Sequence, residues 1–387
     1  MRNPLPIFSV CPQSTDDDRK SASIARADGR VELMRVVRTF ANARTLLRNP
    51  AGRQAGFRAS LVKAILKRPP ILYLHGLEHR RQRRAAARFF TPRAVDTIYR
   101  PLMERTSDEL IAHLRTTGRA ELDEMALDMA VRNAAEIVGL TNGDCGAMAR
   151  RLEALVTYGV PQGESKLSAV LAFFRSQVLT MKFLWRDVKP AIAARRRQRR
   201  EDIISHLLDE GYSERDILIE CLTYGAAGMI TTREFITMSG WHLLENEKLR
   251  ERFLAGGEAT RIAILAEILR LEPVVGLLFR RIDPDVAVVA VDVRAANCDE
   301  AAVGVCPHLI DPDRKTAEKV DGMGLAFGDG EHHCPGEHVA LQEAAVFLDR
   351  LLRVPGIRLA RVPDMGWSAL MTSYELRGAT LTCDQMA

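Results

Sequence analysis

The sequence predicts a mainly helical protein with a minor β portion. Apolar residues recur at spacings of three and four through most of the middle of the chain, as they do on one face of a helix. β-Branched residues are concentrated later in the chain, in the pattern of strands. The 387 residues, 47% hydrophobic and 27% charged, are sufficient to bury a large core. We therefore expect a large helical body that carries small sheets.

The expected helices follow from periodicity and from signals at their ends. Ser213 is expected to be the N-cap of a long helix that starts at Glu214 and runs towards Leu244. Pro335 suits a first helical turn and is expected to begin a final helix that ends near Leu352. Further helices are expected at 108–116, 122–138, 167–184, 201–208 and 263–271.

Two later segments are expected to form strands. Residues 285–293 are rich in β-branched side chains, and residues 374–383 alternate weakly between apolar and polar. The sequence contains no internal repeat and no composition change that would separate two domains. We therefore expect one domain over 31–387, preceded by a flexible N-terminal segment, 1–30.

Charge and cysteine content exclude several classes of protein. The net charge of +5, from 55 basic and 50 acidic residues, is too small to indicate a nucleic-acid-binding protein. Seven scattered cysteines do not fit a secreted disulfide framework. The first 30 residues lack the pattern of a signal peptide, and no apolar run has the length of a membrane anchor. These observations favour a soluble cytoplasmic protein.

The most informative segment is the cysteine loop, FGDGEHHCPG at 327–336. Its glycines allow a tight turn and a close approach of the backbone to a flat cofactor. The start of the expected final helix lies directly behind Cys334, and the dipole of a helix N-terminus stabilises a thiolate. His332 adds a cationic group two residues before the cysteine. This combination predicts a thiolate that binds a metal ion.

Two other interpretations of the loop remain open. Cys334 and His338, together with His332 and His333, could bind zinc, although no cysteine pair at zinc spacing accompanies them. Cys334 could also be an inert cysteine in a glycine turn. His333 is interpreted as a surface histidine without a functional role.

The loop resembles the haem-binding signature of the cytochrome P-450 superfamily, in the spacing Phe-x-x-Gly-x-His-x-Cys-x-Gly that ends at Gly336. The resemblance implies haem b, iron protoporphyrin IX, held between the long helix and the helix after the loop. Cys334 would be the axial thiolate ligand of the iron, Phe327 would pack near the sulfur, and His332 would contact a haem propionate. Gly328 would belong to the same haem-binding turn.

Motifs elsewhere in the chain extend the resemblance. Glu267 and Arg270 lie three residues apart on one helical face and are similar to the family's structural Glu-x-x-Arg pair. His79 and Arg83 lie one turn apart and would contact a haem propionate, whereas Arg280 would bind the other. Asn297 is similar to the asparagine of an Asn-Arg-Asp stretch, with Cys298 in place of the arginine.

The long helix contains AAGMITT at 226–232, which resembles the oxygen-activating segment of the family. Gly228 would let a flat cofactor approach, and Thr231 would bond the carbonyl one turn back and steady iron-bound dioxygen. Ile230 occupies the position at which the family usually carries an acid. Glu234, three residues beyond Thr231, is the candidate that could replace that acid in proton delivery.

The resemblance implies a monooxygenase that inserts one atom of O2 into a hydrophobic small molecule, terpenoid, fatty acyl or polyketide-like. Electrons would come from a separate ferredoxin or flavodoxin-type donor with its reductase. The donor would dock on Arg80, Arg81, Arg84 and Arg88. The expected substrate pocket is lined by a lid segment, 53–74, and by Ala226, Ala227, Ile230, Val274 and Val275.

Because Ile230 removes the usual acid, two alternatives stay open: a non-catalytic haem-thiolate ligand sensor or scaffold, and a peroxide-driven variant. A second departure concerns the thiolate. Pro335 carries no N–H, so it cannot donate a hydrogen bond to the sulfur, and we expect a more electron-donating thiolate.

Overall fold

The computed structural model describes residues 20–21, 35–56, 68–158, 166–282 and 287–385. The expectation of a flexible segment at 1–30 thus falls, apart from residues 20 and 21, outside the described residues. The longer helices are α2 (Phe40–Arg48), α4 (Gly76–Ala86), α6 (Arg100–Thr117), α7 (Leu122–Val138), α8 (Cys145–Tyr158), α9 (Lys166–Phe183), α10 (Lys189–Arg197), α11 (Ile203–Asp209), α12 (Glu214–Gly225), α13 (Thr231–Glu245), α14 (Glu247–Ala255), α15 (Glu258–Leu271) and α18 (Glu337–Leu351).

The strands form three small sheets. The largest has the order β1-β5-β4-β2, in which β1 and β5 are parallel and the other pairs antiparallel. The others are β3-β9-β6 and the hairpin β7-β8. The strands are β1 (Arg35–Val37), β2 (Arg53–Gln54), β3 (Arg119–Glu121), β4 (Leu277–Arg281), β5 (Val289–Asp292), β6 (Arg358–Arg361), β7 (Asp364–Ser368), β8 (Ser373–Arg377) and β9 (Thr380–Thr382). The prediction of a mainly helical fold with a minor β portion is confirmed.

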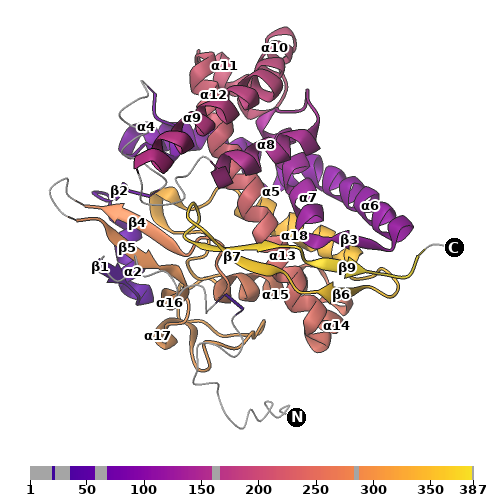
Figure 1. The fold of residues 1–387 in the computed structure, drawn as a ribbon. Helices are drawn as coiled ribbons and strands as arrows, with labels where there is room; N and C mark the ends of the chain where they lie inside the picture. Colours follow the sequence, from indigo (N-terminus) through magenta and orange to yellow (C-terminus); the bar gives the residue numbers. More distant parts are fainter. Residues whose placement is uncertain (1–19, 22–34, 57–67, 159–165, 283–286, 386–387) are drawn as a thin grey trace.

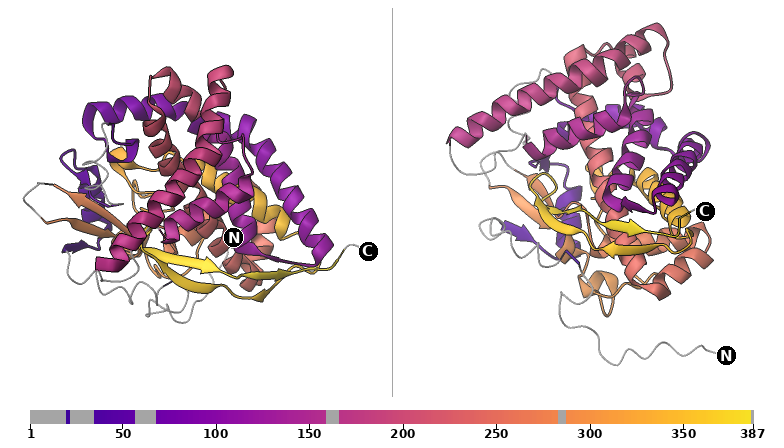
Figure 2. Two further views of the ribbon diagram at one scale, coloured as in Figure 1. Left: turned by 45° about the horizontal axis from the view of Figure 1, so that its top comes forward. Right: turned by 45° about the vertical axis from the view of Figure 1, so that its right-hand side comes forward.

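The helices and sheets occupy different parts of the molecule. Figure 1 shows the four-stranded sheet at one edge and most of the helices on the opposite side, with β7 and β8 crossing the front. Figure 2 shows α9 running along the outside of the helical part. Within the described residues, no helix is both long and apolar enough to cross a membrane.

The long central helix begins where the sequence predicts. The Ser213 hydroxyl accepts the N–H of Asp216, and the Asp216 carboxylate accepts the N–H of Ser213, so a capping box starts α12. The helix continues through a π-helical turn, η6 (Ala226–Ile230), into α13. A π-turn inserts an extra residue and locally breaks the α-helical hydrogen-bond ladder, a feature that is frequent at functional sites.

The central helix is held by close packing at a small residue. α13 packs against α7, and a Cβ added at Gly240 of α13 would come within 2.8 Å of a methyl group of Leu122 and 3.3 Å of one of Leu348. Glycine at 240 therefore lets α7 and α18 approach the central helix directly. The central helix belongs to the main hydrophobic core, in which α6 also packs against α18.

Several predicted elements differ from the observed ones in their bounds. The final helix starts at Glu337, after the N-cap Gly336, so Pro335 precedes the helix and does not open it. Segment 374–383 is two strands and not one, because Gly378 has a φ of +71° and turns the chain between β8 and β9. The predicted helices 108–116 and 263–271 lie within α6 and α15, and 122–138 has the bounds of α7. The predicted helices 167–184 and 201–208 match α9 and α11 to within two residues at each end.

Candidate active site

The cysteine loop is closed by its own backbone. The N–H of Cys334 donates to the carbonyl of Phe327 at 2.9 Å. Gly328 and Gly330 have φ values of +74° and +72°, which favour glycine. A Cβ at Gly330 would lie 2.6 Å from the carbonyl oxygen of Leu47, so the loop lies directly against α2. This arrangement places Cys334 immediately before the N-terminus of α18.

The surroundings of Cys334 have opposing effects on the pKa of its thiol. Burial raises the pKa of the thiol to about 11, whereas hydrogen bonds from the backbone of Gly336 and Glu337 and the charge of Arg83 lower it. The side chain is nevertheless partly exposed. A thiol in such a place becomes a thiolate when a cation binds it, because the cation offsets the cost of burying the charge.

Zinc is not supported as that cation. Within the described residues, no group of three or more His, Cys, Asp or Glu side chains is arranged to hold a metal ion. His333, which was interpreted as a surface histidine without a role, is half-buried and bonds Glu337 at 2.6 Å and the carbonyl of Gly328 at 3.3 Å. It therefore ties the loop to the start of α18 and is not a zinc ligand.

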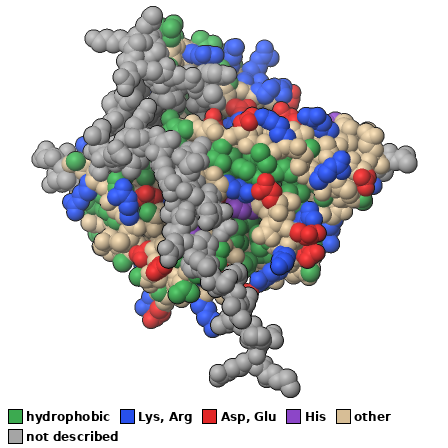
Figure 3. Space-filling model, turned by 60° about the horizontal axis from the view of Figure 1, so that its bottom comes forward, with side chains coloured by type: hydrophobic (Ala, Val, Ile, Leu, Met, Phe, Trp, Pro, Cys, Tyr) green, Lys and Arg blue, Asp and Glu red, His purple; other side chains and the backbone are tan. Residues whose placement is uncertain are grey.

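Basic side chains converge beside the loop. The rings of His79 on α4 and His332 in the loop are 4.4 Å apart. Burial, followed by the charges of His79, Arg280, Arg83 and His75, lowers the pKa of His332 to about 3. His75, the N-cap residue of α4, was not singled out from the sequence; its position four residues before His79 is the signal that could have found it. Figure 3 shows histidine side chains near the centre of one face, beside hydrophobic ones.

This basic cluster fits an acidic cofactor. Nδ1 of His79 and Nε2 of His332 are buried and have no hydrogen-bond partner among the described residues. Arg83 donates to the carbonyl of His333 at 2.6 Å. Unpaired buried polar atoms are costly, so convergent donors of this kind point to a missing acceptor, as the carboxylates of haem would provide.

Arg280 lies on β4 and is 3% exposed. Its guanidinium donates to the side-chain oxygen of Gln54, its cross-strand partner on β2, and to the carbonyl of Phe279 at 3.0 Å. Both acceptors are neutral, and burial lowers the pKa of Arg280 to about 10. A buried cation that has only these neutral acceptors among the described residues suits a cofactor carboxylate.

The segment around Thr231 has an open side and a buried side. Ala227 is exposed, and Ala226, Gly228 and Thr231 are partly exposed, although they lie in the middle of the molecule's longest helix. The hydroxyl of Thr231 donates to the carbonyl of Ala227. This bond is the one that the sequence predicts for Thr231, and together with the π-turn it departs from regular α-helical geometry at this position.

Two predicted residues of this segment, Ile230 and Gly228, do not face the open side of the helix. Ile230 is 2% exposed and belongs to the hydrophobic core, so the prediction that it lines the pocket is wrong. A Cβ added at Gly228 would point towards Ala134 of α7, at 3.4 Å. Gly228 therefore allows close helix packing, and its missing side chain does not open the cofactor side.

The remaining candidates for the substrate pocket differ in their exposure, and some lie outside the described residues. Both valines after α15 are expected to line the pocket, but Val274 is buried and belongs to the main hydrophobic core. Val275 is partly exposed and remains a candidate wall residue. Of the expected lid, 53–74, residues 57–67 lie outside the described part of the chain. Its described ends form β2 and a short 3-10 helix, η2 (Ile71–Tyr73).

Glu234 does not lie in the position expected of a proton donor. It is fully buried, and its carboxylate accepts the N–H of Leu376 at 2.7 Å and a guanidinium N–H of Arg377 at 2.8 Å, both on β8. It also bonds Arg233 at 2.9 Å. Both oxygens are thus occupied in joining α13 to the β7-β8 hairpin, and this placement corrects the expected relay role to a structural one.

Glu267 and Arg270 form a buried bidentate ion pair, with distances of 2.8 and 2.7 Å. Arg270 also donates to the carbonyls of Asn297 and Pro307, each at 2.8 Å. Arg314, which the sequence interpretation missed, bonds Glu267 at 2.8 Å. An arginine within the loop sequence DPDRK is a weak signal, because such residues are usually solvated.

Arg314 and Asn297 extend this network over the segment before the cysteine loop. Arg314 donates to the carbonyls of four residues; these are Val303, Val305, Cys306 and Leu309. Asn297 accepts the N–H of Leu325 at 2.7 Å and donates to the carbonyl of Arg270 at 3.1 Å. The network therefore fixes the chain that leads into the loop.

Comparisons with known proteins show which family the chain is similar to. The chain is 30% identical over 308 residues to the mycinamicin IV hydroxylase/epoxidase of Micromonospora griseorubida, covering 75% of this chain and 74% of that protein. It is 26% identical over 348 residues to cytochrome P-450 107B1 of Saccharopolyspora erythraea, covering 84% and 79%. No family model matches the chain.

Solved structures show the same fold. CalO2 aligns with a TM-score of 0.77 at 22% identity, covering 96% of this chain and 99% of that chain. The fold and the cysteine loop together define a haem-thiolate protein. The chain belongs to the cytochrome P-450 superfamily and is a monooxygenase of that family, for which haem, O2, a small-molecule substrate and a redox partner are implied.

The backbone donors around Cys334 lead to a prediction about Pro335. Replacing Pro335 with leucine restores an N–H beside the sulfur, and one added hydrogen bond of ~1 kcal/mol corresponds to roughly 40 mV for one electron. We expect the reduction potential to rise by that order in a spectroelectrochemical titration. Pro335→Ala restores the same N–H with a smaller side chain and should give the same shift; an unchanged potential in both variants would contradict the prediction.

Proposed function

We propose that this chain inserts one atom of O2 into a hydrophobic small molecule, using haem b bound within a single domain, 31–387. When bound, the haem supplies oxygen activation. Cys334 would be the axial ligand, in a loop formed by Phe327, Gly328 and Gly336. The partnerless nitrogens of His79 and His332 carry the proposal, because they need acceptors where a haem propionate would lie.

We base the proposed roles of the other site residues on their positions in the structure. Arg83 would hold the same propionate as the two histidines, and Arg280 the second. Thr231, on the open side of the π-turn, would bind water or dioxygen beside the haem, and Ala226, Ala227 and Val275 would contact the substrate. These walls are apolar, which favours a terpenoid, fatty acyl or polyketide-like substrate.

Relatives support oxygen insertion as the reaction. One is named a hydroxylase/epoxidase, and another, 28% identical over 301 residues, is the nocardicin C N-oxygenase of Nocardia uniformis subsp. tsuyamanensis. The test is a screen of apolar compounds for a spin-state shift of the bound haem, followed by turnover under ¹⁸O₂. One labelled oxygen atom in the product is expected, and product without label would overturn the proposal.

Ile230 favours a second candidate, a ligand sensor or a peroxide-driven enzyme, because no acid stands at that position of the helix. Substrate-dependent consumption of reductant separates the proposed monooxygenase from these alternatives. A sensor binds the compound without consuming reductant, and a peroxide-driven enzyme forms product from peroxide alone.

The electron donor is proposed to be an acidic ferredoxin or flavodoxin-type protein that docks on α4 and on the short 3-10 helix after it, η3 (Ala87–Phe90). Arg80 and Arg81 already pair with Glu331 and Glu210, each at 3.0 Å. Arg84 and Arg88 are exposed and form no ion pair with the described residues, so they are the stronger candidates for contacting a partner.

Reversing both charges, in the double variant Arg84→Glu and Arg88→Glu, is expected to slow reduction by an acidic ferredoxin roughly tenfold at low salt. Stopped-flow reduction measures the rate, and the difference should shrink as salt screens the charges. Arg105→Glu, an exposed arginine on α6, is the control. Equal effects of the two variants would place the docking surface elsewhere.

A further inference from the structure

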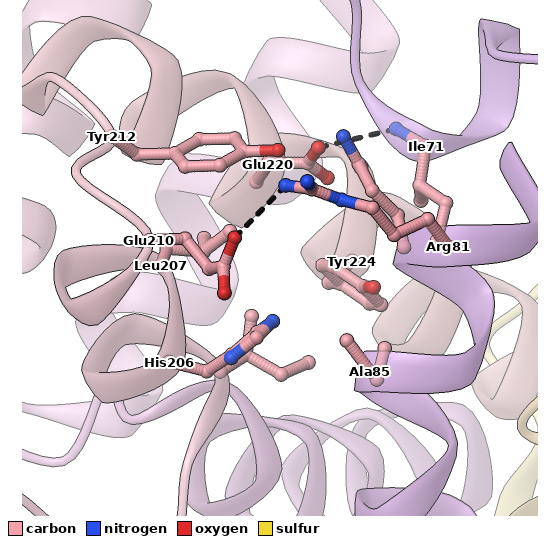
Figure 4. A pocket seen from close by; sticks show the side chains of 12 residues that line it. Ile71, Arg81, Ala85, His206, Leu207, Glu210, Tyr212, Glu220 and Tyr224 are labelled. Atoms are coloured by element: carbon pink, nitrogen blue, oxygen red, sulfur yellow. Dashed lines mark hydrogen bonds and ion pairs between the residues drawn. The ribbon is translucent and has the colours of Figure 1, made fainter. Parts of the chain in front are cut away.

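A cavity lies between α4 on one side and α11 and α12 on the other (Figure 4). Its volume is about 270 Å³, large enough for several water molecules. The exposed pair of Arg81 and Glu210 lies on its rim, and Glu220 lies at its buried end. The cavity thus connects the surface of the molecule with a buried carboxyl group.

Glu220 is 3% exposed and only half satisfied. One carboxyl oxygen accepts the N–H of Ile71 at 3.1 Å, and the other, Oε2, has no hydrogen-bond partner in the described part of the chain. Burial raises the pKa of Glu220 to about 8, against the opposing effect of the Ile71 hydrogen bond. At neutral pH the group therefore carries a proton and can donate it into the cavity.

Tyr224 links this cavity to the candidate haem site. It lies one helical turn after Glu220 and lines the same cavity, with its ring stacked on Phe90 at 6.3 Å. Arg83 interacts electrostatically with both Tyr224 and Cys334. Seven residues further along the same helix, about 10 Å by its rise, Thr231 lies on the open side of the π-turn.

Neither of the expected positions near Thr231 provides an acid that could deliver a proton. Ile230 occupies the usual acidic position with a buried hydrocarbon side chain, and the carboxylate of Glu234 is occupied by three partners. Glu220 is buried, has an oxygen without a partner, and faces a cavity of sufficient size for water.

We propose that Glu220 and Tyr224 form the proton-delivery route of this enzyme, in place of the missing acid at position 230. The proposal rests on the proposed function. The proton of Glu220 passes through cavity water to the Tyr224 phenol, whose own proton passes through water to the hydroxyl of Thr231. Solvent at the rim returns a proton to Glu220, so the route ends each cycle unchanged.

Other titratable groups border the route. These are Arg81 and Glu210 at the rim, His206 on α11, Tyr212 with the guanidinium of Arg68 over its ring at 4.8 Å, and Asp216 on α12. Asp216 raises the pKa of Glu220, and Glu220 raises that of Tyr212. Since Glu220 donates only while protonated, delivery should fall as the pH rises through about 8.

The first test measures protonation without turnover. Infrared spectra of the haem-loaded protein at pH 7 should contain a carboxylic-acid C=O band that Glu220→Gln removes. Glu343→Gln is a matched control: burial also raises the pKa of Glu343 to about 8, but Glu343 lies on α18 and does not line the cavity. An ionised Glu220 at pH 7 would overturn the proposal.

The second test compares two ways of driving oxidation of thioanisole, a small apolar probe. Oxidation driven by O2 and reductant takes up two protons from solvent, whereas oxidation driven by hydrogen peroxide takes up none overall. Glu220→Gln and Tyr224→Phe should lower the first rate roughly tenfold or more. Both should leave the second rate, and the haem content, as in the wild type, and Glu343→Gln should change neither rate.

The outcomes are distinguishable. Equal loss of both rates in Glu220→Gln would indicate a structural role, and retention of both would remove Glu220 from the route; either overturns the inference alone. A wild-type protein that binds haem but oxidises the probe by neither route would overturn the proposed function and this inference with it.

Discussion

Replacing Cys334 with serine is expected to abolish the strongly red-shifted Soret band of the reduced protein under carbon monoxide. That shift requires a thiolate opposite the gas, and serine offers a weak neutral oxygen in its place. The loop should still form, because its closing hydrogen bond from the N–H of residue 334 to the carbonyl of Phe327 belongs to the backbone. The measurement is the reduced, carbon monoxide-bound spectrum at matched haem content.

Cys145→Ser is the control for this experiment. Cys145 is also a free, partly exposed cysteine, but it lies on α8, outside the loop. The band should persist in this variant. If it also persists in Cys334→Ser, or is missing in folded, haem-loaded wild-type protein, Cys334 is not the ligand.

Replacing Arg270 with methionine is expected to produce the largest loss of stability among the described ion pairs. Arg270 is fully buried, and its removal leaves Glu267 with Arg314 as its remaining cationic partner and two carbonyls without their donor. Breaking a buried ion pair on one side costs about 3–5 kcal/mol. The free energy of unfolding, from urea titration of the haem-loaded protein, measures the effect.

An exposed pair provides the matched comparison. Arg252 pairs with Asp313, but the two side chains are 40% and 73% exposed, so Arg252→Met should cost at most about 1 kcal/mol. Because the network of Arg270 fixes the chain before the cysteine loop, Arg270→Met should also lose haem faster. Equal stabilities of the two variants would contradict a structural role for the Glu267–Arg270 pair.

Local signals explain why much of the fold follows from the sequence. The cap at Ser213 depends on a carboxylate three residues away, and the turn of the cysteine loop depends on glycines within the loop itself. Such interactions are encoded by spacing. The start of the final helix was misplaced by two residues, because Pro335 is compatible with a first turn and also with the loop before it.

The ion-pair and hydrogen-bond partners of charged residues cannot be predicted from local spacing in the sequence. Glu234 has the spacing of a proton donor for Thr231, yet β8, more than 140 residues later, occupies its carboxylate. Glu220 has no distinguishing motif, and its unpartnered oxygen is visible only once α4 and α12 enclose a cavity. Arg314 similarly reaches Glu267 across 47 positions of sequence.

By itself the sequence determined the helical class, the long capped helix and the loop that presents Cys334, because these depend on residues within a few positions of one another. The tertiary structure decided which acid has a free oxygen, which histidine nitrogens lack partners and which glycine serves helix packing. Those properties depend on what lies opposite each side chain, and segments far apart in the chain supply it.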